Sequence, residues 1–136
     1  MGITAGTPDQ GNRVVVAYVD GRRVKGHTYN FSAMKDVLTV FSKDNNEKIE
    51  TPMRELKAIF FVKDFEGTPN KPEEEADRMP QGRPIEVTFK DGEKLKGATN
   101  GYNPQKLGFF MLPALANSNN LRIFVVSSNT AAVKLG

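Results

Sequence analysis

The chain has 136 residues, of which 38% are hydrophobic and 26% are charged, a composition typical of a soluble globular protein. It has no cysteine and a single histidine, which excludes a disulfide framework, a thiolate metal site and a multi-histidine metal centre. The 19 basic and 16 acidic residues are interspersed, so the net charge of +3 does not by itself indicate a nucleic-acid-binding patch.

Residues 1–12 contain Gly, Thr, Pro and Asp without periodicity, and we expect them to form a flexible leader. No secretory signal and no apolar run of membrane-spanning length is present. We therefore expect a cytoplasmic protein with no membrane partner and no cofactor.

The first half of the chain predicts five short strands. They cover residues 13–19, 22–31, 36–41, 48–51 and 57–62, with a single helical turn at 52–56. Asp20-Gly21 predicts a tight type I′ hairpin turn, which needs positive φ at both central residues. Gly26 lies inside the second strand, where glycine often marks a sharp bend or a close approach of two backbones.

The second half of the chain repeats the first at a constant offset of 71 residues, as from Val16 to Val87. The identical pairs are Val16/Val87, Asp20/Asp91, Gly21/Gly92, Lys25/Lys96, Gly26/Gly97 and Thr28/Thr99. After an insertion of three residues, Ile49 matches Ile123 and Ile59 matches Val133. The repeat predicts strands at 85–90, 93–100, 107–112, 121–126 and 131–135, with a helical turn at 127–130.

Five short strands with a helical turn before the last describe a small, strongly bent, partly open barrel. We therefore expect an all-β protein with one barrel at 13–64 and a second at 83–136. Residues 65–82 contain prolines and an acidic run, and they are predicted to be the linker, with one helical turn possible at Glu-Glu-Glu-Ala-Asp. Because each unit is too small to bury a large core alone, the two barrels should pack together.

Three predicted strands contain uninterrupted apolar runs, at 59–62, 109–112 and 123–126. A strand with one face in water should alternate apolar and polar residues, so both faces of these strands must be covered. The cover is either the other unit or another chain. The candidate interface residues are Ile59, Phe60, Phe61, Phe109, Phe110, Met111, Phe124 and Val126.

The sequence at 14–40 resembles the first motif of the Sm and Sm-like proteins: alternating apolar residues, D/N-G-R, an apolar residue, a Gly and a Phe. The matching residues are Asp20, Gly21, Arg22, Val24, Gly26 and Phe31, and the second half keeps Asp91, Gly92, Leu95, Gly97 and Tyr102. The resemblance implies two tandem five-stranded Sm-like (SH3-like) barrels.

In the Sm family, the Asn of a Met-Asn run and an Arg-Gly pair near the last strands line an RNA site. In this chain Lys35-Asp36 occupies the Met-Asn position, and the Arg-Gly pair is absent from 52–54 and 127–129. Because the carboxylate of Asp36 would repel phosphate, we expect no tight RNA binding.

Asn30-Phe31-Ser32, which follows Gly26, resembles the D/N-x-S-x-x-G element of PilZ domains. That resemblance implies binding of a cyclic dinucleotide, whose phosphates an upstream R-x-x-x-R motif grips in PilZ domains. The arginines available here are Arg13, Arg22 and Arg23.

No catalytic constellation is recognisable, and we expect a protein that is not an enzyme. Aromatic and basic residues near the second strand of each unit have the composition of a nucleic-acid or peptide groove. These candidate ligand-binding residues are Arg22, Arg23, Tyr29, Phe31, Lys94, Lys96 and Tyr102. Alternatively, Phe31 and Tyr102, which are equivalent in the repeat, cap the two barrel cores.

Two hypotheses about function remain open. The first is a non-enzymatic interaction or adaptor module with a protein partner or self-association. The second is a protein that binds nucleic acid (RNA) or a cyclic dinucleotide.

Overall fold

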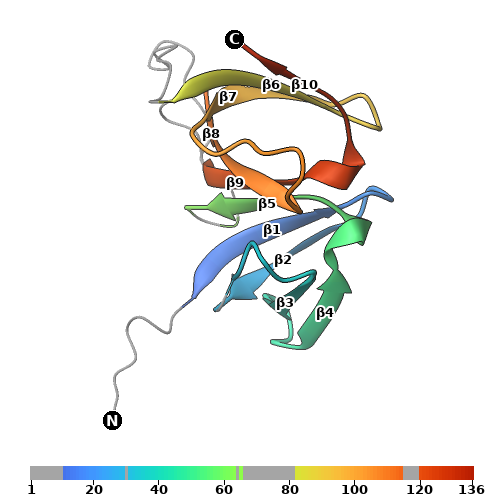
Figure 1. The fold of residues 1–136 in the computed structure, drawn as a ribbon. Helices are drawn as coiled ribbons and strands as arrows, with labels where there is room; N and C mark the ends of the chain where they lie inside the picture. The colour runs from blue at the N-terminus through green and yellow to red at the C-terminus, as the bar shows by residue number, and fades with distance from the viewer. Residues whose placement is uncertain (1–10, 30, 64, 66–81, 115–119) are drawn as a thin grey trace.

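The computed structural model describes residues 11–29, 31–63, 65, 82–114 and 120–136. In these ranges the protein is all-β and contains no α-helix (Figure 1). The strands are β1 (Asn12–Tyr18), β2 (Arg23–Thr28), β3 (Val37–Ser42), β4 (Lys48–Pro52), β5 (Leu56–Val62), β6 (Arg83–Phe89), β7 (Lys94–Thr99), β8 (Gly108–Pro113), β9 (Asn120–Val126) and β10 (Thr130–Leu135). One 3₁₀ turn, Met53–Glu55, precedes β5, and another, Ser127–Asn129, precedes β10.

Every predicted strand and both predicted helical turns are confirmed, and the strand ends differ from the prediction by no more than three residues. The largest difference is at the end of β2, which was predicted at Phe31 and lies at Thr28. The predicted leader lies outside the described residues except for Gly11 and Asn12, and Asn12 already belongs to β1. Of the predicted linker, only Phe65 and Gly82 are described, so its acidic run lies outside the described ranges.

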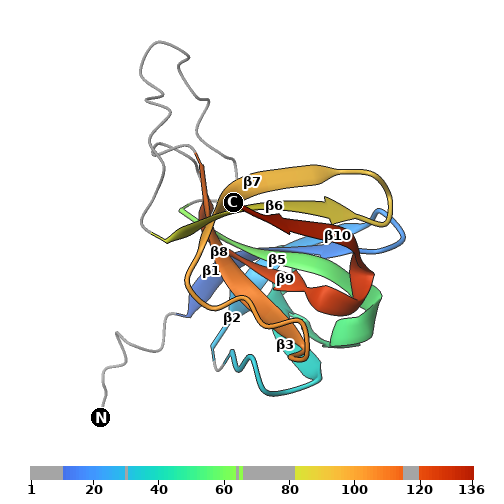
Figure 2. The same cartoon turned by 45° about the horizontal axis from the view of Figure 1, so that its top comes forward.

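All ten strands form one antiparallel sheet, in the order β10-β6-β7-β8-β9-β5-β1-β2-β3-β4. Each half of the chain contributes five neighbouring strands in the same order, and the halves join where β5 pairs with β9. We call this pairing the joint. Figure 1 shows the first half below and the second half above, with β5 and β9 between them, and these two strands stay side by side in the turned view of Figure 2.

The internal repeat extends to the hydrogen-bond register. Val16 pairs with Ile59 in the first half, and their equivalents Val87 and Val133 pair in the second. Both halves have an irregularity at the same place, where the first strand of the half ends against the start of the last. A bulge at this position increases the local twist and helps each half to curl.

The hairpin turns are not of the predicted type I′. Gly21 has φ of 98° and Gly92 has φ of 95°, but neither preceding aspartate has a positive φ. The Tyr18 amide donates to the Arg22 carbonyl, and the Gly21 amide donates to the Tyr18 carbonyl. This is a three-residue loop, a type I turn followed by a glycine in the left-handed region. The Asp20 side chain accepts from the Arg22 amide at 3.0 Å, which favours this loop over the two-residue turn.

Replacing Gly21 or Gly92 with valine is expected to lower the free energy of unfolding by about 1 kcal/mol or more. No atom lies within 4 Å of a Cβ built at either position, so the cost comes from the positive φ and not from a clash. Urea denaturation measures the change. Gly101→Val is the control, because Gly101 also has open space around it but no positive φ. Unchanged midpoints for both turn variants would contradict the turn geometry.

The predicted close approach at the mid-strand glycines is confirmed. A Cβ at Gly26 would lie 2.3 Å from the Phe41 carbonyl oxygen, and one at Gly97 would lie 1.8 Å from the Leu112 carbonyl oxygen. Neither distance is possible for a real side chain, so only glycine allows β2 and β3, or β7 and β8, to pass so closely.

The hydrophobic interior consists of two clusters, each centred on one half of the chain. Each cluster also contains side chains from the other half. Side chains of β5 and β9 alternate between the clusters because successive residues of a strand point to opposite faces. The first cluster takes Leu56, Ile59, Phe61, Phe124 and Val126 from these strands, and the second takes Ala58, Phe60, Val62, Ile123 and Val125; Leu56 lies beyond the irregularity at the start of β5. Phe109 and Met111 belong to the second cluster, and Phe110 packs against the first.

Candidate functional site

Two hollows occupy equivalent places in the repeat. The Lys48 pocket, about 270 Å³, lies in the first half, and the Arg122 pocket, about 430 Å³, lies in the second. Eight positions line both pockets in matching order along the two halves. The pairs are Thr28/Thr99, Tyr29/Asn100, Lys35/Lys106, Val37/Gly108, Leu38/Phe109, Thr39/Phe110, Phe41/Leu112 and Lys48/Arg122, and Ala33 of the first half also lines the Arg122 pocket.

The hollows open where the second and third strands of each half separate. Strand β2 pairs with β3 only at Gly26 and His27, and β7 pairs with β8 only at Gly97 and Ala98. Beyond that point a threonine hydroxyl replaces the backbone ladder: Thr28 Oγ1 donates to the Thr39 carbonyl at 2.9 Å. The equivalent Thr99 hydroxyl donates in the same way at 2.7 Å, so the fold builds the same gap twice.

Arg122 is the dominant charge of the larger pocket. It projects from β9, directly across the joint from Phe61, and its guanidinium carbon lies 4.4 Å from the ring centroids of both Phe61 and Phe110. Burial lowers the pKa of Arg122, although a guanidinium remains charged at any physiological pH. In the other pocket the equivalent Lys48 lies 3.7 Å from Glu50.

A second polar group ties the halves together across the joint. The Lys57 ammonium, on β5, donates to Asp91 Oδ2 at 2.8 Å and to Glu93 Oε1, and it lies 5.0 Å from the Phe89 ring centroid. Burial by itself would lower the pKa of Lys57, but the two carboxylate hydrogen bonds and charges outweigh it and raise this pKa. The hydrogen bond from Lys57 lowers the pKa of Asp91. Because the Lys57 charge is balanced by carboxylates of the same chain, we interpret this cluster as a contact that stabilises the packing of the two halves.

Lys57→Met is expected to destabilise the protein at neutral pH, by an amount that depends on pH. The raised Lys57 pKa means that its contribution is full below the ordinary value of 10.5 and is lost above it. The lowered Asp91 pKa means that its contribution is full above the ordinary value of 3.8 and is lost as pH falls below it. Denaturation at several pH values should show the largest difference from wild type between these limits. A difference independent of pH would contradict the ion pair.

The comparison with known families adds one finding. Residues 10–136 match a family model described as a family of unknown function, DUF6982. The chain belongs to the DUF6982 family. No curated protein and no solved structure matches this DUF6982 chain. Among its described residues, no cluster of three or more His, Asp or Glu side chains could hold a metal ion. The same residues include no helix long and apolar enough to cross a membrane.

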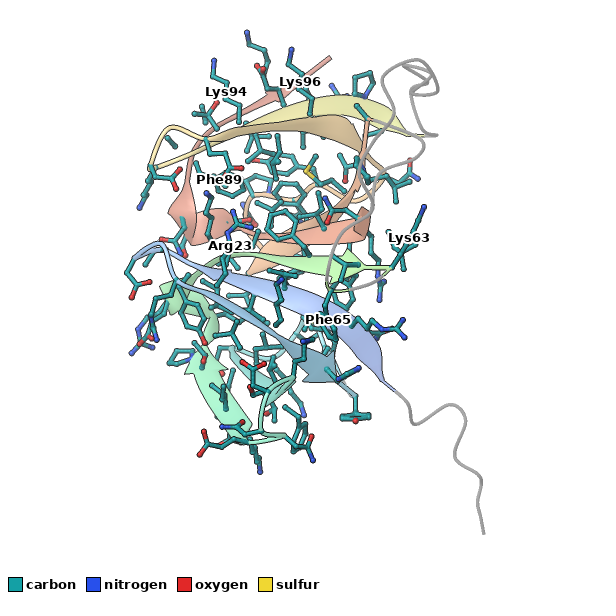
Figure 3. All side chains as sticks on the ribbon, turned by 180° about the vertical axis from the view of Figure 1, so that it is seen from behind. Arg23, Lys63, Phe65, Phe89, Lys94 and Lys96 are labelled. Carbon is teal, nitrogen blue, oxygen red and sulfur yellow. The ribbon has the colours of Figure 1, made fainter. Side chains whose placement is uncertain are left out.

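The basic residues predicted to bind a ligand do not meet in this DUF6982 chain. Arg22 is engaged by Asp20, with 2.9 Å between Nε and Oδ2. Figure 3 shows Lys94 and Lys96 projecting from the top of the second half, whereas Arg23 lies near the joint. The structure therefore places Arg22 and Arg23 beside the β1–β2 turn of one half, and Lys94 and Lys96 on β7 of the other.

The predicted aromatic residues lie at the far end of the second strands from Arg22 and Arg23. Tyr29 makes a T-shaped contact with Phe41, with 5.5 Å between the ring centroids, and it lines the Lys48 pocket. Phe31 packs against the first cluster, and Tyr102 contacts Phe109 at 4.9 Å in the second. Of the predicted ligand-binding residues, Tyr29 and Phe31 line the Lys48 pocket together.

Sequence reasoning did not identify Arg122 or the pocket lysines. The available signal was the repeat itself, because continuing the three-residue insertion places Arg122 at the position of Lys48 and pairs two basic residues. Lys35 and Lys106 match at the plain offset. Each of these residues looks like an ordinary surface charge when it is considered alone.

Proposed function

We propose that the chain is a non-enzymatic interaction module built from two Sm-like small barrels that share one sheet. Its support is the repeated strand order, in which the first strand of each half pairs with the second and the last. The glycine-containing hairpin loop and the close approach at a mid-strand glycine also occur in both halves. A cytoplasmic location stays a prediction.

An exposed apolar patch beside the Lys48 pocket carries the proposed interaction role. Tyr29, Met34 and Val37 are 44%, 82% and 43% exposed, and they lie at or between residues that line this pocket. The equivalent positions in the second half are Asn100, Gln105 and Gly108, which present no large apolar side chain. Because the fold forms without apolar residues at these positions, their presence in one half indicates a surface that a partner covers.

The charges around this patch support a partner with acidic groups. Lys35 and Lys48 line the Lys48 pocket, and none of its described lining residues is acidic, although Glu50 lies 3.7 Å from Lys48. A protein segment that inserts an apolar side chain beside one or more carboxylates fits this combination of shape and charge. We therefore assign the patch to a protein partner with an acidic, apolar docking segment.

Capture experiments with two matched variants test this role. Met34→Asp should abolish capture of the partner from a lysate, because it adds a like charge where the acidic segment would dock. Gln105→Asp, at the equivalent loop position of the second half, should leave capture unchanged. Both substitutions are in loops outside the sheet, and thermal unfolding should confirm that both variants remain folded. Capture that is equal for both variants would contradict the proposal.

Binding of RNA or a cyclic dinucleotide is the competing function, and we expect it to be weak. Asp36 is exposed at the loop where the Sm family has its RNA-binding asparagine, and Arg22 is paired with Asp20. Fluorescence anisotropy with labelled RNA, DNA and a cyclic dinucleotide at two salt concentrations should give no Kd as low as about 1 μM for any of these ligands. Tighter RNA binding that Arg22→Ala removes would replace the partner-docking proposal with the nucleic-acid one.

A further inference from the structure

Among the described residues, the Arg122 pocket contains positive charge without a counter-charge. Arg122 and Lys106 both line it, and none of its lining residues is acidic. Across the ranges that the structure describes, no carboxylate lies within ion-pair distance of either residue. The Arg122 guanidinium is half-buried against the adjoining rings of Phe61 and Phe110, so it has lost part of its hydration, which the rings only partly replace.

Of the two equivalent pockets, the one at the joint has a basic residue packed against phenylalanine rings, and the Lys48 pocket does not. In the Lys48 pocket the positions of Phe110 and Phe124 are occupied by Thr39 and Glu50, and Glu50 lies close to the lysine. Phe61 reaches Arg122 only because β9 pairs with β5. The repeat thus supplies two hollows of common origin, of which one has an exposed lysine beside a glutamate and the other an arginine packed against two aromatic rings.

The shape of the pocket matches its charge. Its volume of about 430 Å³ is in the usual range for sites that hold small organic molecules. Phe110 and Leu112 supply the accessible apolar lining, with Phe109, Met111 and Phe124 buried behind it, and Thr99 and Asn100 add polar groups to the lining. The Thr99 hydroxyl is already used, since it donates to the Phe110 carbonyl and accepts from the Gly101 amide.

We propose that the Arg122 pocket binds a small ligand with a flat apolar body and a single anionic group, either a carboxylate or a phosphate. The planar guanidinium can donate two parallel hydrogen bonds to such a group, and Lys106 adds a second positive charge at the pocket lining. The flat body would lie against Phe110 and Leu112. This site is separate from the partner-docking patch, and each can fail without the other.

Titration with six probes tests the proposal and separates the two anion types. Indole-3-acetate and adenosine 5′-monophosphate carry both features, indole and adenosine lack the charge, and acetate and inorganic phosphate lack the body. At least one aromatic anion should bind with a Kd below about 1 mM, about ten-fold or more tighter than its neutral and body-less counterparts. Isothermal titration calorimetry suits the measurement, because the chain has no tryptophan to report binding.

Arg122→Gln should lower the affinity for the aromatic anion by about ten-fold or more, whereas Lys48→Gln in the equivalent pocket should leave that affinity unchanged. Lys106→Gln is a second test variant, on an exposed loop residue, in case the Arg122 variant does not fold. Amide shifts in nuclear magnetic resonance spectra should locate the ligand at Gly101 and Gly108. Failure of both aromatic anions to bind below about 1 mM, or binding that survives both variants, would overturn the proposal.

Discussion

Expressed separately, residues 13–64 and 83–136 should fail to fold as stable monomers. Separation leaves β5 and β9 without their shared ladder and exposes side chains such as Phe60 and Phe124, which are buried in the other half's cluster. Burying one large apolar side chain contributes about 1.5–3 kcal/mol. Several of them together are comparable to the whole stability of a small domain, about 5–15 kcal/mol.

Circular dichroism and sedimentation of each fragment, alone and mixed, measure this effect. Aggregation or dimerisation of the separate fragments, with recovery of cooperative unfolding on mixing, is the expected result. Two soluble monomeric fragments that unfold cooperatively and have no affinity for each other would contradict the shared interior.

Phe124→Ala should cost about 3–5 kcal/mol of unfolding free energy. Phe124 is fully buried and contacts Phe31 and Phe110, each at 5.1 Å between ring centroids. The repeat provides a matched control in Glu50→Ala, at the equivalent position of β4. Glu50 is exposed and makes only a surface ion pair, so its removal should change stability by about 0.5 kcal/mol or less. Similar costs for the two variants, measured by urea denaturation, would contradict the assignment of β9 to the interior.

The sequence was sufficient to predict the strands, because period, turn residues and the internal repeat all act locally. The close approach at Gly26 and Gly97 was predictable for the same reason. The turn type was not, because the Asp20 carboxylate accepts from the Arg22 amide and keeps a negative φ, and the dipeptide alone does not reveal that contact.

The candidate sites could not be predicted from the sequence, because they depend on contacts between distant parts of the chain. Apolar runs at 59–62 and 123–126 indicated covered faces, but they could not show that β5 pairs with β9, a contact between distant parts of the chain. The predicted ligand residues were grouped by closeness in sequence. A strand advances about 3.3 Å per residue, which separates Arg23 from Tyr29 at opposite ends of β2. The Arg122 pocket depends on the joint and on residues from both halves.

The sheet has two free edges, β4 and β10, and they are the repeat equivalents of the two strands that meet at the joint. The same pairing between separate molecules would add one chain after another and produce an open-ended fibre. The residues at these edges oppose such growth. Glu50 and Lys134 stand where the joint has Phe124 and Phe60, and Pro52 removes a backbone donor from β4. These residues disfavour, at the edges of the sheet, the pairing that the joint makes once inside the chain.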